Sequence, residues 1–204
     1  MNTVTLAVAA YLIGSVSFAV IMSLVFRLPD PRTYGSGNPG ATNVLRSGNK
    51  FAAVLTLLGD AFKGWLAVWV AQHFAAADSA DLTMAIAGAL AVIGHMYPVF
   101  HRFQGGKGVA TALGALFGFN LYLGLGAIST WLIIAIFFRM SSFASITTAL
   151  FALFATWLLY GYSHPFLASV AVMAVLLIYR HRQNISNMLA GTESKLGHKS
   201  KPSA

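Results

Sequence analysis

The chain contains no cysteine and few charged residues, and both shortages narrow what it can be. Because cysteine is absent from all 204 residues, disulfides and thiolate chemistry are excluded. Charged residues make up only 9% of the chain, against roughly a quarter in an ordinary soluble domain. The five acidic residues do not group with the six histidines in the sequence. We therefore expect no metal site and no cofactor.

Apolar sequence, in contrast, is abundant. Hydrophobic residues account for 57% of the chain, and the mean hydropathy is +0.72. The apolar runs lie at about 3–26, 51–75, 82–100, 109–119, 121–138, 142–160 and 163–179. This pattern predicts an all-α polytopic membrane protein, with residues 1–191 as one integral membrane catalytic domain and 192–204 as a basic, polar cytoplasmic tail. The first run lacks a basic n-region and is too long for an h-region, so we expect a retained span rather than a signal peptide.

The segment from 108 to 138 can be interpreted in two ways. As one helix it would be roughly 46 Å long at ~1.5 Å per residue, too long for a hydrocarbon core of about 30 Å. As two helices, the first is short, and Asn120 with the neighbouring glycines Gly118 and Gly124 allows a turn between them. We favour two helices.

The distribution of basic residues predicts the topology. The net charge is +8, and the Lys and Arg residues flank apolar spans, so we expect cytoplasmic retention and contact with membrane lipid rather than a nucleic acid partner. The connections at 76–81, 119–120 and 161–164 contain no Lys or Arg. Seven transmembrane helices with the N-terminus outside place every basic cluster and the C-terminus in the cytoplasm. Six would leave the basic tail outside.

The densest polar sequence is a glycine-rich loop that reads G-S-G-N-P-G-A-T-N-V-L-R from position 35 to 46. Glycine allows backbone conformations that aim successive N–H groups at an anion, while hydroxyls, amides and an arginine add donors. An ordinary polar turn needs the glycines but not so many donors. Besides Ser36, the residues that we expect to bind a substrate phosphate here are Gly35, Gly37, Asn38, Gly40, Thr42, Asn43 and Arg46.

A second polar segment runs from Phe103 to Thr111 and contains Gly105, Gly106, Lys107 and Gly108 at the start of an apolar run. Backbone N–H groups, a helix dipole and a lysine would converge there on an anion. The pattern is not a Walker A loop, which needs Gly at 101 and Ser or Thr at 108, so nucleotide hydrolysis is not supported. His95, near the end of the preceding span, is either a packed or hydrogen-bonded histidine or a catalytic one.

Further polar side chains follow or interrupt other spans. His181 and Asn184 lie three residues apart after the last apolar run and so share one helical face. Asp60 and Lys63 share such a face inside the second span, where they either neutralise each other or border the site. Ser142, next to a short basic connection, offers one more hydroxyl to the substrate phosphate.

A match to a known acyltransferase motif near residue 75 is treated as coincidence. His73 and Asp78 fit H-x4-D, a signature of acyltransferases that use thioester donors, but they lie in an alanine-rich connection away from the glycine loops.

Together, G-S-G-N-P-G-A-T-N-V-L-R, G-H-x-x-P with F-x-G-G-K-G-V-A-T, and H-x-x-N-I followed by G-x-E-x-K resemble the bacterial acyl-phosphate:glycerol-3-phosphate acyltransferases of the PlsY type. The resemblance covers nearly the whole chain. At Asn187 and Met188 we expect Arg-Leu in that family, so no cationic role is carried over to position 187.

This resemblance implies a multi-pass enzyme of the bacterial inner membrane with its substrate loops on the cytoplasmic side. It would transfer a fatty acyl group from acyl phosphate to the 1-hydroxyl of sn-glycerol 3-phosphate, giving lysophosphatidate and phosphate in the first step of phospholipid synthesis. No obligatory protein partner is expected. The residues with an expected catalytic role are Ser36, Lys107, His181 and Asn184. His95, Asp60 and Lys63 are expected to contact these catalytic residues without touching the substrate.

Two other functions compete with this interpretation. A transporter of a phosphorylated metabolite would commonly have repeat-related halves and a midplane site, and the sequence has neither. A membrane scaffold would not explain the density of donors. A mixed anhydride has a good leaving group, so we expect direct attack by the glycerol hydroxyl, with its proton passing either to the donor's phosphate or to His181.

Overall fold

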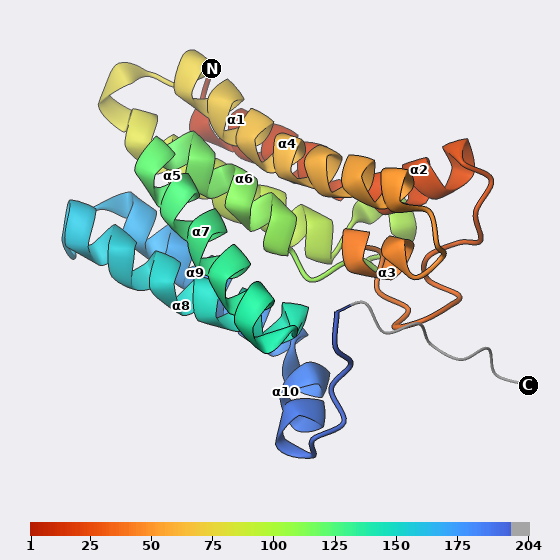
Figure 1. Ribbon diagram of the computed structural model, residues 1–204. Coiled ribbons are helices and arrows are strands. Elements are labelled where there is room, and N and C mark those ends of the chain that lie inside the picture. Colours follow the sequence, from red (N-terminus) through yellow and green to blue (C-terminus); the bar gives the residue numbers. More distant parts are fainter. Residues whose placement is uncertain (197–204) are drawn as a thin grey trace, which may run out of the picture.

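The structure is a computed structural model that describes residues 1–196, and all regular secondary structure in that part of the chain is helical (Figure 1). The α-helices are α1 (Thr3–Ser15), α2 (Phe18–Val25), α3 (Ala41–Leu45), α4 (Lys50–Phe74), α5 (Ala80–Met96), α6 (Val109–Phe119), α7 (Leu121–Phe138), α8 (Ser141–Tyr160), α9 (Pro165–Arg180) and α10 (Arg182–Leu189). Two 3-10 turns, η1 (Ala77–Ser79) and η2 (Val99–His101), flank α5.

Each predicted apolar run is helical, but the helices differ in their ability to cross a bilayer. Five segments are long and apolar enough to span, and α9 with α10 forms a sixth candidate that bends by 56°. Helix α6 has only 11 residues, about 16 Å at ~1.5 Å per residue, well short of the ~30 Å hydrocarbon core. The structure therefore supports five or six candidate spans, and the seven-span count and its orientation stay predictions.

The first apolar run is broken into two helices, which the sequence did not reveal. Val16 and Ser17 adopt extended conformations between α1 and α2, with ψ of 122° and 101°. Lys63 from α4 donates to the carbonyl of Val16 at 2.6 Å. A carbonyl released by the break is thus satisfied inside the bundle, as a buried polar group requires.

The division at Asn120 is confirmed. Asn120 is extended (φ −163°, ψ 133°), and its side-chain oxygen accepts from the backbone N–H of Tyr122 at 2.8 Å, which caps α7. Helix α6 packs closely against α4 through glycine. A Cβ added at Gly114 would lie 1.8 Å from the carbonyl oxygen of Ala61, and one at Gly64 would lie 2.1 Å from that of Thr111. Glycine at these two positions thus lets the two helices approach closely.

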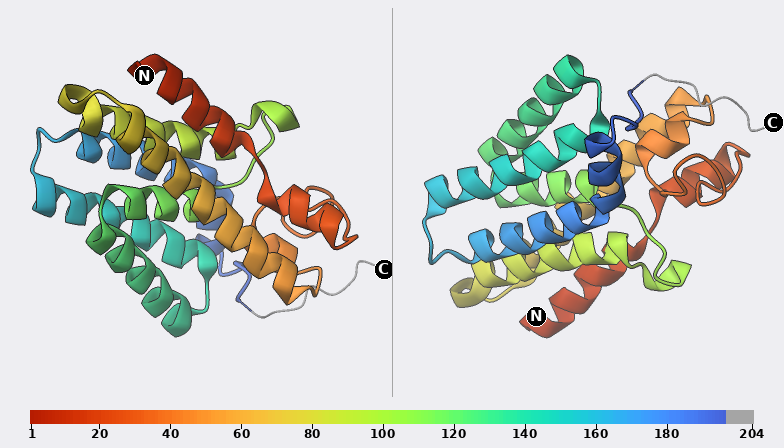
Figure 2. Two further views of the ribbon diagram at one scale, coloured as in Figure 1. Left: turned by 90° about the horizontal axis from the view of Figure 1, so that it is seen from above. Right: turned by 90° about the horizontal axis from the view of Figure 1, so that it is seen from below.

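The connections between the helices lie at two opposite ends of the bundle (Figures 1 and 2). The N-terminus, the α4–α5 connection and the α8–α9 connection lie at one end. Helices α3 and α10 lie at the other, so the three polar sequence segments of the chain meet there. This end carries the candidate site.

Candidate active site

A cavity of about 670 Å³ opens at the end of the bundle that carries α3 and α10. Its outer part is lined by polar side chains from all three sequence segments, and its inner part by apolar side chains of α6, α7, α8 and α9. The polar residues at this outer part include Ser36, Asn38, Thr42, Asn43, Arg46, Lys107, Ser141, Ser142, His181, Asn184, Glu193, Ser194 and Lys195. A single cavity with a cationic mouth and an apolar interior fits a molecule that is part anion and part hydrocarbon.

The 35–46 loop is held in shape by Asn43, which is buried. Its amide donates to the carbonyls of Pro31 at 2.6 Å and Tyr34 at 3.1 Å, and its oxygen accepts from the N–H of Ser36 at 3.0 Å. Gly35 has φ +60°, and a Cβ there would lie 2.3 Å from the Asn43 oxygen. Asn43 therefore braces the loop from within, a task that differs from the predicted direct contact with phosphate.

Other donors of this loop face the cavity. Arg46 donates to Ser194 Oγ at 2.9 Å, so the segment after α10 reaches across to α3. The hydroxyls of Thr42 and Ser141 lie 3.5 Å apart. Gly40 lines the cavity, whereas Gly37 lines a smaller neighbouring pocket. Ser36 and Arg46 are thus brought together with residues far away in sequence.

The second glycine segment packs on His95, which is buried. The N–H of Gly106 donates to the His95 carbonyl at 3.1 Å, and Cβ atoms added at Gly105 and Gly106 would lie 2.1 Å from His95 atoms. Gly108 has φ +83° and precedes α6. Of this segment, Lys107, Gly108, Val109 and Ala110 line the cavity. Gly105 and Gly106 are buried between His95 and Arg180 of α9.

The third segment contributes a neutral histidine. His181 follows the last residue of α9, is buried, and its Nδ1–H donates to the Leu177 carbonyl at 2.8 Å, which leaves the lone pair on Nε2. Burial lowers the pKa of His181 to about 4. On the same face, Asn184 accepts a hydrogen bond from Lys107 Nζ through its side-chain oxygen. The structure brings Lys107, His181 and Asn184 together, since all three line the same cavity.

Glu193 belongs to the same cluster, although sequence reasoning assigned it no role. Its Oε1 accepts from Ser142 Oγ at 2.6 Å and from the Asn184 amide at 2.7 Å. Burial lowers the pKa of Lys107, and the nearby Glu193 charge opposes that shift. The place of Glu193 in the G-x-E-x-K pattern was the signal that could have identified this residue. The predicted tail thus begins inside the site, and its residues 197–204 lie outside the described part of the chain.

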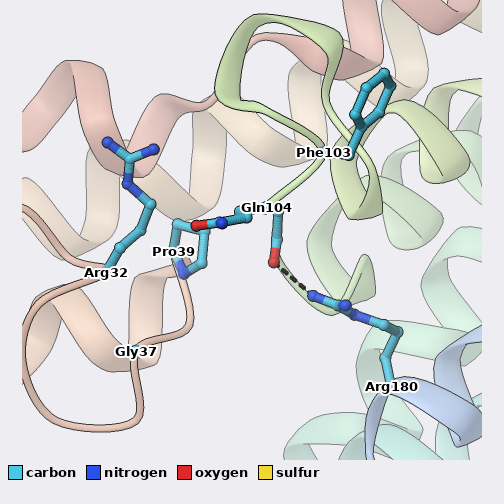
Figure 3. A pocket seen from close by; sticks show the side chains of 7 residues that line it. Arg32, Gly37, Pro39, Phe103, Gln104 and Arg180 are labelled. Carbon is cyan, nitrogen blue, oxygen red and sulfur yellow. Dashed lines mark hydrogen bonds between the residues drawn. The ribbon is translucent and has the colours of Figure 1, made fainter.

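Arg180 was interpreted from the sequence only as a topology signal, but it contacts the second glycine segment. Its guanidinium donates to the carbonyl of Gly105 at 2.6 Å (Figure 3) and to that of Gly106 at 3.1 Å, and these are the two residues before Lys107. It also lies 5.5 Å from the ring centroid of Tyr97. Arg180 and Gly105 also line the smaller pocket, which has a volume of about 270 Å³. Its other lining residues are Arg32, Gly37, Pro39, Phe103 and Gln104.

Asp60, Lys63 and His95 form a buried charge cluster behind the site. Lys63 Nζ lies 2.8 Å from Asp60 Oδ1 and 2.9 Å from His95 Nδ1. Asp60 and His95 also line the cavity. Asp60 and Lys63 therefore pair with each other, and of these two residues Asp60 also lines the cavity. Within residues 1–196, no group of three or more His, Asp or Glu side chains is arranged to hold a metal ion.

His73 and Asp78 lie at the opposite end of the bundle, around the α4–α5 connection. The H-x4-D match therefore has no part in the cavity.

Comparisons with known proteins agree with this arrangement. Residues 4–191 match the family described as glycerol-3-phosphate acyltransferase. A glycerol-3-phosphate acyltransferase of Ralstonia nicotianae is 62% identical over 98% of this chain and 97% of its own length. One of Burkholderia ambifaria is 58% identical over 100% of this chain and 95% of its own.

Two solved structures are similar throughout. They are crystal structures of PlsY, an integral membrane glycerol 3-phosphate acyltransferase, in its glycerol 3-phosphate and lysophosphatidic acid forms. The first has a TM-score of 0.88 at 38% identity and covers 96% of both chains. The second has a TM-score of 0.87 at 37% identity, covering 96% of this chain and 95% of the other.

Proposed function

Because this chain belongs to the glycerol-3-phosphate acyltransferase family, we propose that its acyl donor is acyl phosphate and its acceptor the 1-hydroxyl of sn-glycerol 3-phosphate. The products are lysophosphatidate and inorganic phosphate. The observation that carries this proposal is the single cavity, which joins phosphate-directed donors at its mouth to an apolar interior. Both proposed substrates carry phosphate, and one of them is also half lipid.

The cations of the mouth come from different segments, which suits two anionic substrates. Arg46 follows α3 and presents a planar guanidinium, the group best matched to phosphate oxygens. Lys107 precedes α6 and is half-buried, so its charge acts in a less polar surrounding than water. Ser36, Thr42 and Ser142 add hydroxyl donors around them. We assign these groups to orienting the two phosphates and to balancing the charge of the departing one.

The chemical step is a direct acyl transfer. The hydroxyl oxygen of glycerol 3-phosphate forms a bond to the acyl carbonyl carbon, and the bond from that carbon to the phosphate oxygen breaks. Phosphate leaves with the bonding electron pair. No cysteine is available as an intermediate nucleophile, and the anhydride is reactive enough without one.

The hydroxyl proton passes to the departing phosphate rather than to His181. Since the pKa of His181 is lowered to about 4, its Nε2 is a weak base. A phosphate oxygen with a second pKa of about 6 is the stronger acceptor. The Nε2 atom of His181 instead accepts a hydrogen bond from the glycerol 3-phosphate hydroxyl and orients it. The Nδ1–H of His181 is held by the Leu177 carbonyl.

We also propose the predicted topology for this protein, with seven membrane segments, the N-terminus outside and the C-terminus in the cytoplasm of a bacterial inner membrane. The domain boundary at 191 belongs to the same proposal. Glycerol 3-phosphate is water-soluble and acyl phosphate is lipid-like, so their reaction belongs at a membrane surface. The gathering of the three polar segments at one end of the bundle supports this proposal.

The donor is tested by supplying the purified protein with glycerol 3-phosphate and one of three acyl sources, myristoyl phosphate, myristoyl-CoA or a myristoyl carrier-protein thioester. We expect lysophosphatidate from the acyl phosphate alone, because the cavity mouth is built for phosphate and the H-x4-D match lies elsewhere. Comparable turnover with either thioester would contradict the proposal. Heat-inactivated protein supplies the background of uncatalysed transfer.

A further inference from the structure

The apolar part of the cavity ends inside the bundle. Its lining extends on α6 to Leu116, on α7 to Ala127, on α8 to Ala152 and on α9 to Val170. All four side chains are buried, with exposures of 4%, 0%, 4% and 2%. The lining reaches its deepest point with two alanines, so little side-chain volume fills the space there.

An aromatic stack closes the bundle beyond this point. Phe119 lies one turn past Leu116 on α6, and Phe166 lies one turn before Val170 on α9. Their rings stack with centroids 4.4 Å apart and an interplanar angle of 12°. The ring of Tyr160 meets Phe166 edge-on at 5.3 Å. None of these three side chains lines the cavity, and on α6, α8 and α9 all three lie beyond the deepest lining residues.

The depth of the apolar part follows from helix geometry. On α8 the lining extends from Ser142 at the polar mouth to Ala152, and on α9 it extends back from His181 to Val170. At ~1.5 Å per residue, these ten and eleven steps correspond to about 15 and 16 Å. An extended chain advances about 1.2 Å per bond, because the three backbone bonds of one residue span ~3.5 Å. The cavity therefore houses about 13 carbon–carbon bonds.

We propose that the Phe119–Phe166 stack, with Ala127 and Ala152 beside it, sets the longest acyl chain that the enzyme accepts without strain. This inference rests on the proposed function and adds the substrate's chain length to it. Acyl phosphates of up to about fourteen carbons fit extended, from the bond count above. Longer chains meet the aromatic stack and have to bend or hold the reacting carbonyl away from Lys107 and His181.

The selection is steric rather than hydrophobic. Lipid tails are as apolar as leucine, so a methylene gains little by moving from the bilayer into this cavity. A closed end in a tightly packed interior, in contrast, resists each additional methylene. The rate should therefore vary little among short donors and fall once the chain exceeds the cavity.

The first test shortens the cavity with Ala152→Phe. We expect kcat/KM for myristoyl phosphate relative to decanoyl phosphate to fall about tenfold, the order of effect when a ring overfills a packed interior. The matched control is Leu150→Phe on the same helix. Leu150 is 53% exposed on the outside of the bundle, and it should leave the ratio unchanged.

The second test lengthens the cavity with Phe166→Leu, which removes one ring of the stack. Here the rate with stearoyl phosphate relative to myristoyl phosphate should rise severalfold.

Melting temperatures in detergent show whether each variant folds, and if Ala152→Phe does not fold, Phe166→Leu decides alone. Opposite shifts in the two variants support the inference. Equal losses for all chain lengths, or an unchanged profile in a folded Phe166→Leu protein, overturn it while the proposed function stands. A wild-type protein that transfers no acyl group from any acyl phosphate overturns both.

Discussion

Lys107 is held within the site by contacts from two different helices and from Glu193. Its ammonium group donates to Asn184, and Glu193 lies near enough to oppose the lowering of its pKa by burial. The two carbonyls before it are held by Arg180 from α9. The lysine therefore lines the cavity from a loop that is fixed from two sides.

We expect Arg180 to act by positioning Lys107. Removing a charge-assisted contact costs about 1.5–3 kcal/mol, so Lys107→Ala should lower kcat/KM roughly ten- to hundred-fold. Arg180→Gln loses the paired donors to Gly105 and Gly106 and should lower kcat/KM about tenfold. In the Lys107→Ala background the same Arg180 change should have little further effect, because residues in one network do not add.

The matched control for this cycle is Arg182→Gln. Arg182 carries the same charge two residues later, but its guanidinium is exposed and stacks on Tyr179 at 4.7 Å. It should retain near wild-type kcat/KM. Fully additive losses for Arg180 and Lys107 would show that Arg180 acts independently of the lysine.

The sequence identified those candidate site residues that belong to short motifs. Ser36, Lys107, His181 and Asn184 were all recognised from short motifs, and all line the cavity. Arg180 and Glu193 were not assigned, because their partners lie 74 and 51 residues away along the chain. A basic residue after a span also has a sufficient topological explanation, which concealed the contact of Arg180.

Among the helices, α6 depends most on close packing. It is too short to span a bilayer by itself, and it lies against α4 at Gly64 and Gly114. This contact was predictable, since glycine in an apolar helix commonly marks a close approach. The break between α1 and α2 was not, because Val16 is stabilised by Lys63 from another helix, and hydropathy carries no information on such a contact.

Gly114→Ala should therefore separate α6 from α4. The added methyl would lie 1.8 Å from the Ala61 carbonyl oxygen, a backbone atom that cannot move independently. We expect a loss of about 1–3 kcal/mol in stability, measured as a lower melting temperature in detergent. Gly126→Ala on α7 is the control, because its methyl meets only the Phe151 ring at 3.0 Å, which can shift. Equal melting temperatures for both variants would contradict this account of the α4–α6 contact.

For the whole molecule, the sequence predicted the helical class and the gathering of polar segments at one end. It could not establish how many helices cross the membrane. Helix α6 has an apolar sequence but only 11 residues, so composition and length disagree about it. Charge asymmetry favours seven spans, whereas length alone gives five or six.

Cysteine labelling resolves this count, and the cysteine-free chain provides a clean background. Single cysteines at Ser79 and Tyr162 should react with a membrane-impermeant thiol reagent in intact cells. Cysteines at Arg102 and Leu189 should react only after the cells are opened, because the three polar segments should share the cytoplasmic side. Labelling at 189 but not at 102 in intact cells would mean an even number of spans and would separate α10 from the glycine loops.

The central claim is that both substrates occupy one cavity at the same time and react directly. The most direct measurement is the initial velocity of the purified protein with acyl phosphate and glycerol 3-phosphate both varied. Direct transfer in a ternary complex predicts double-reciprocal lines that intersect. Parallel lines, the pattern of a ping-pong reaction with an acyl-enzyme intermediate, would contradict it.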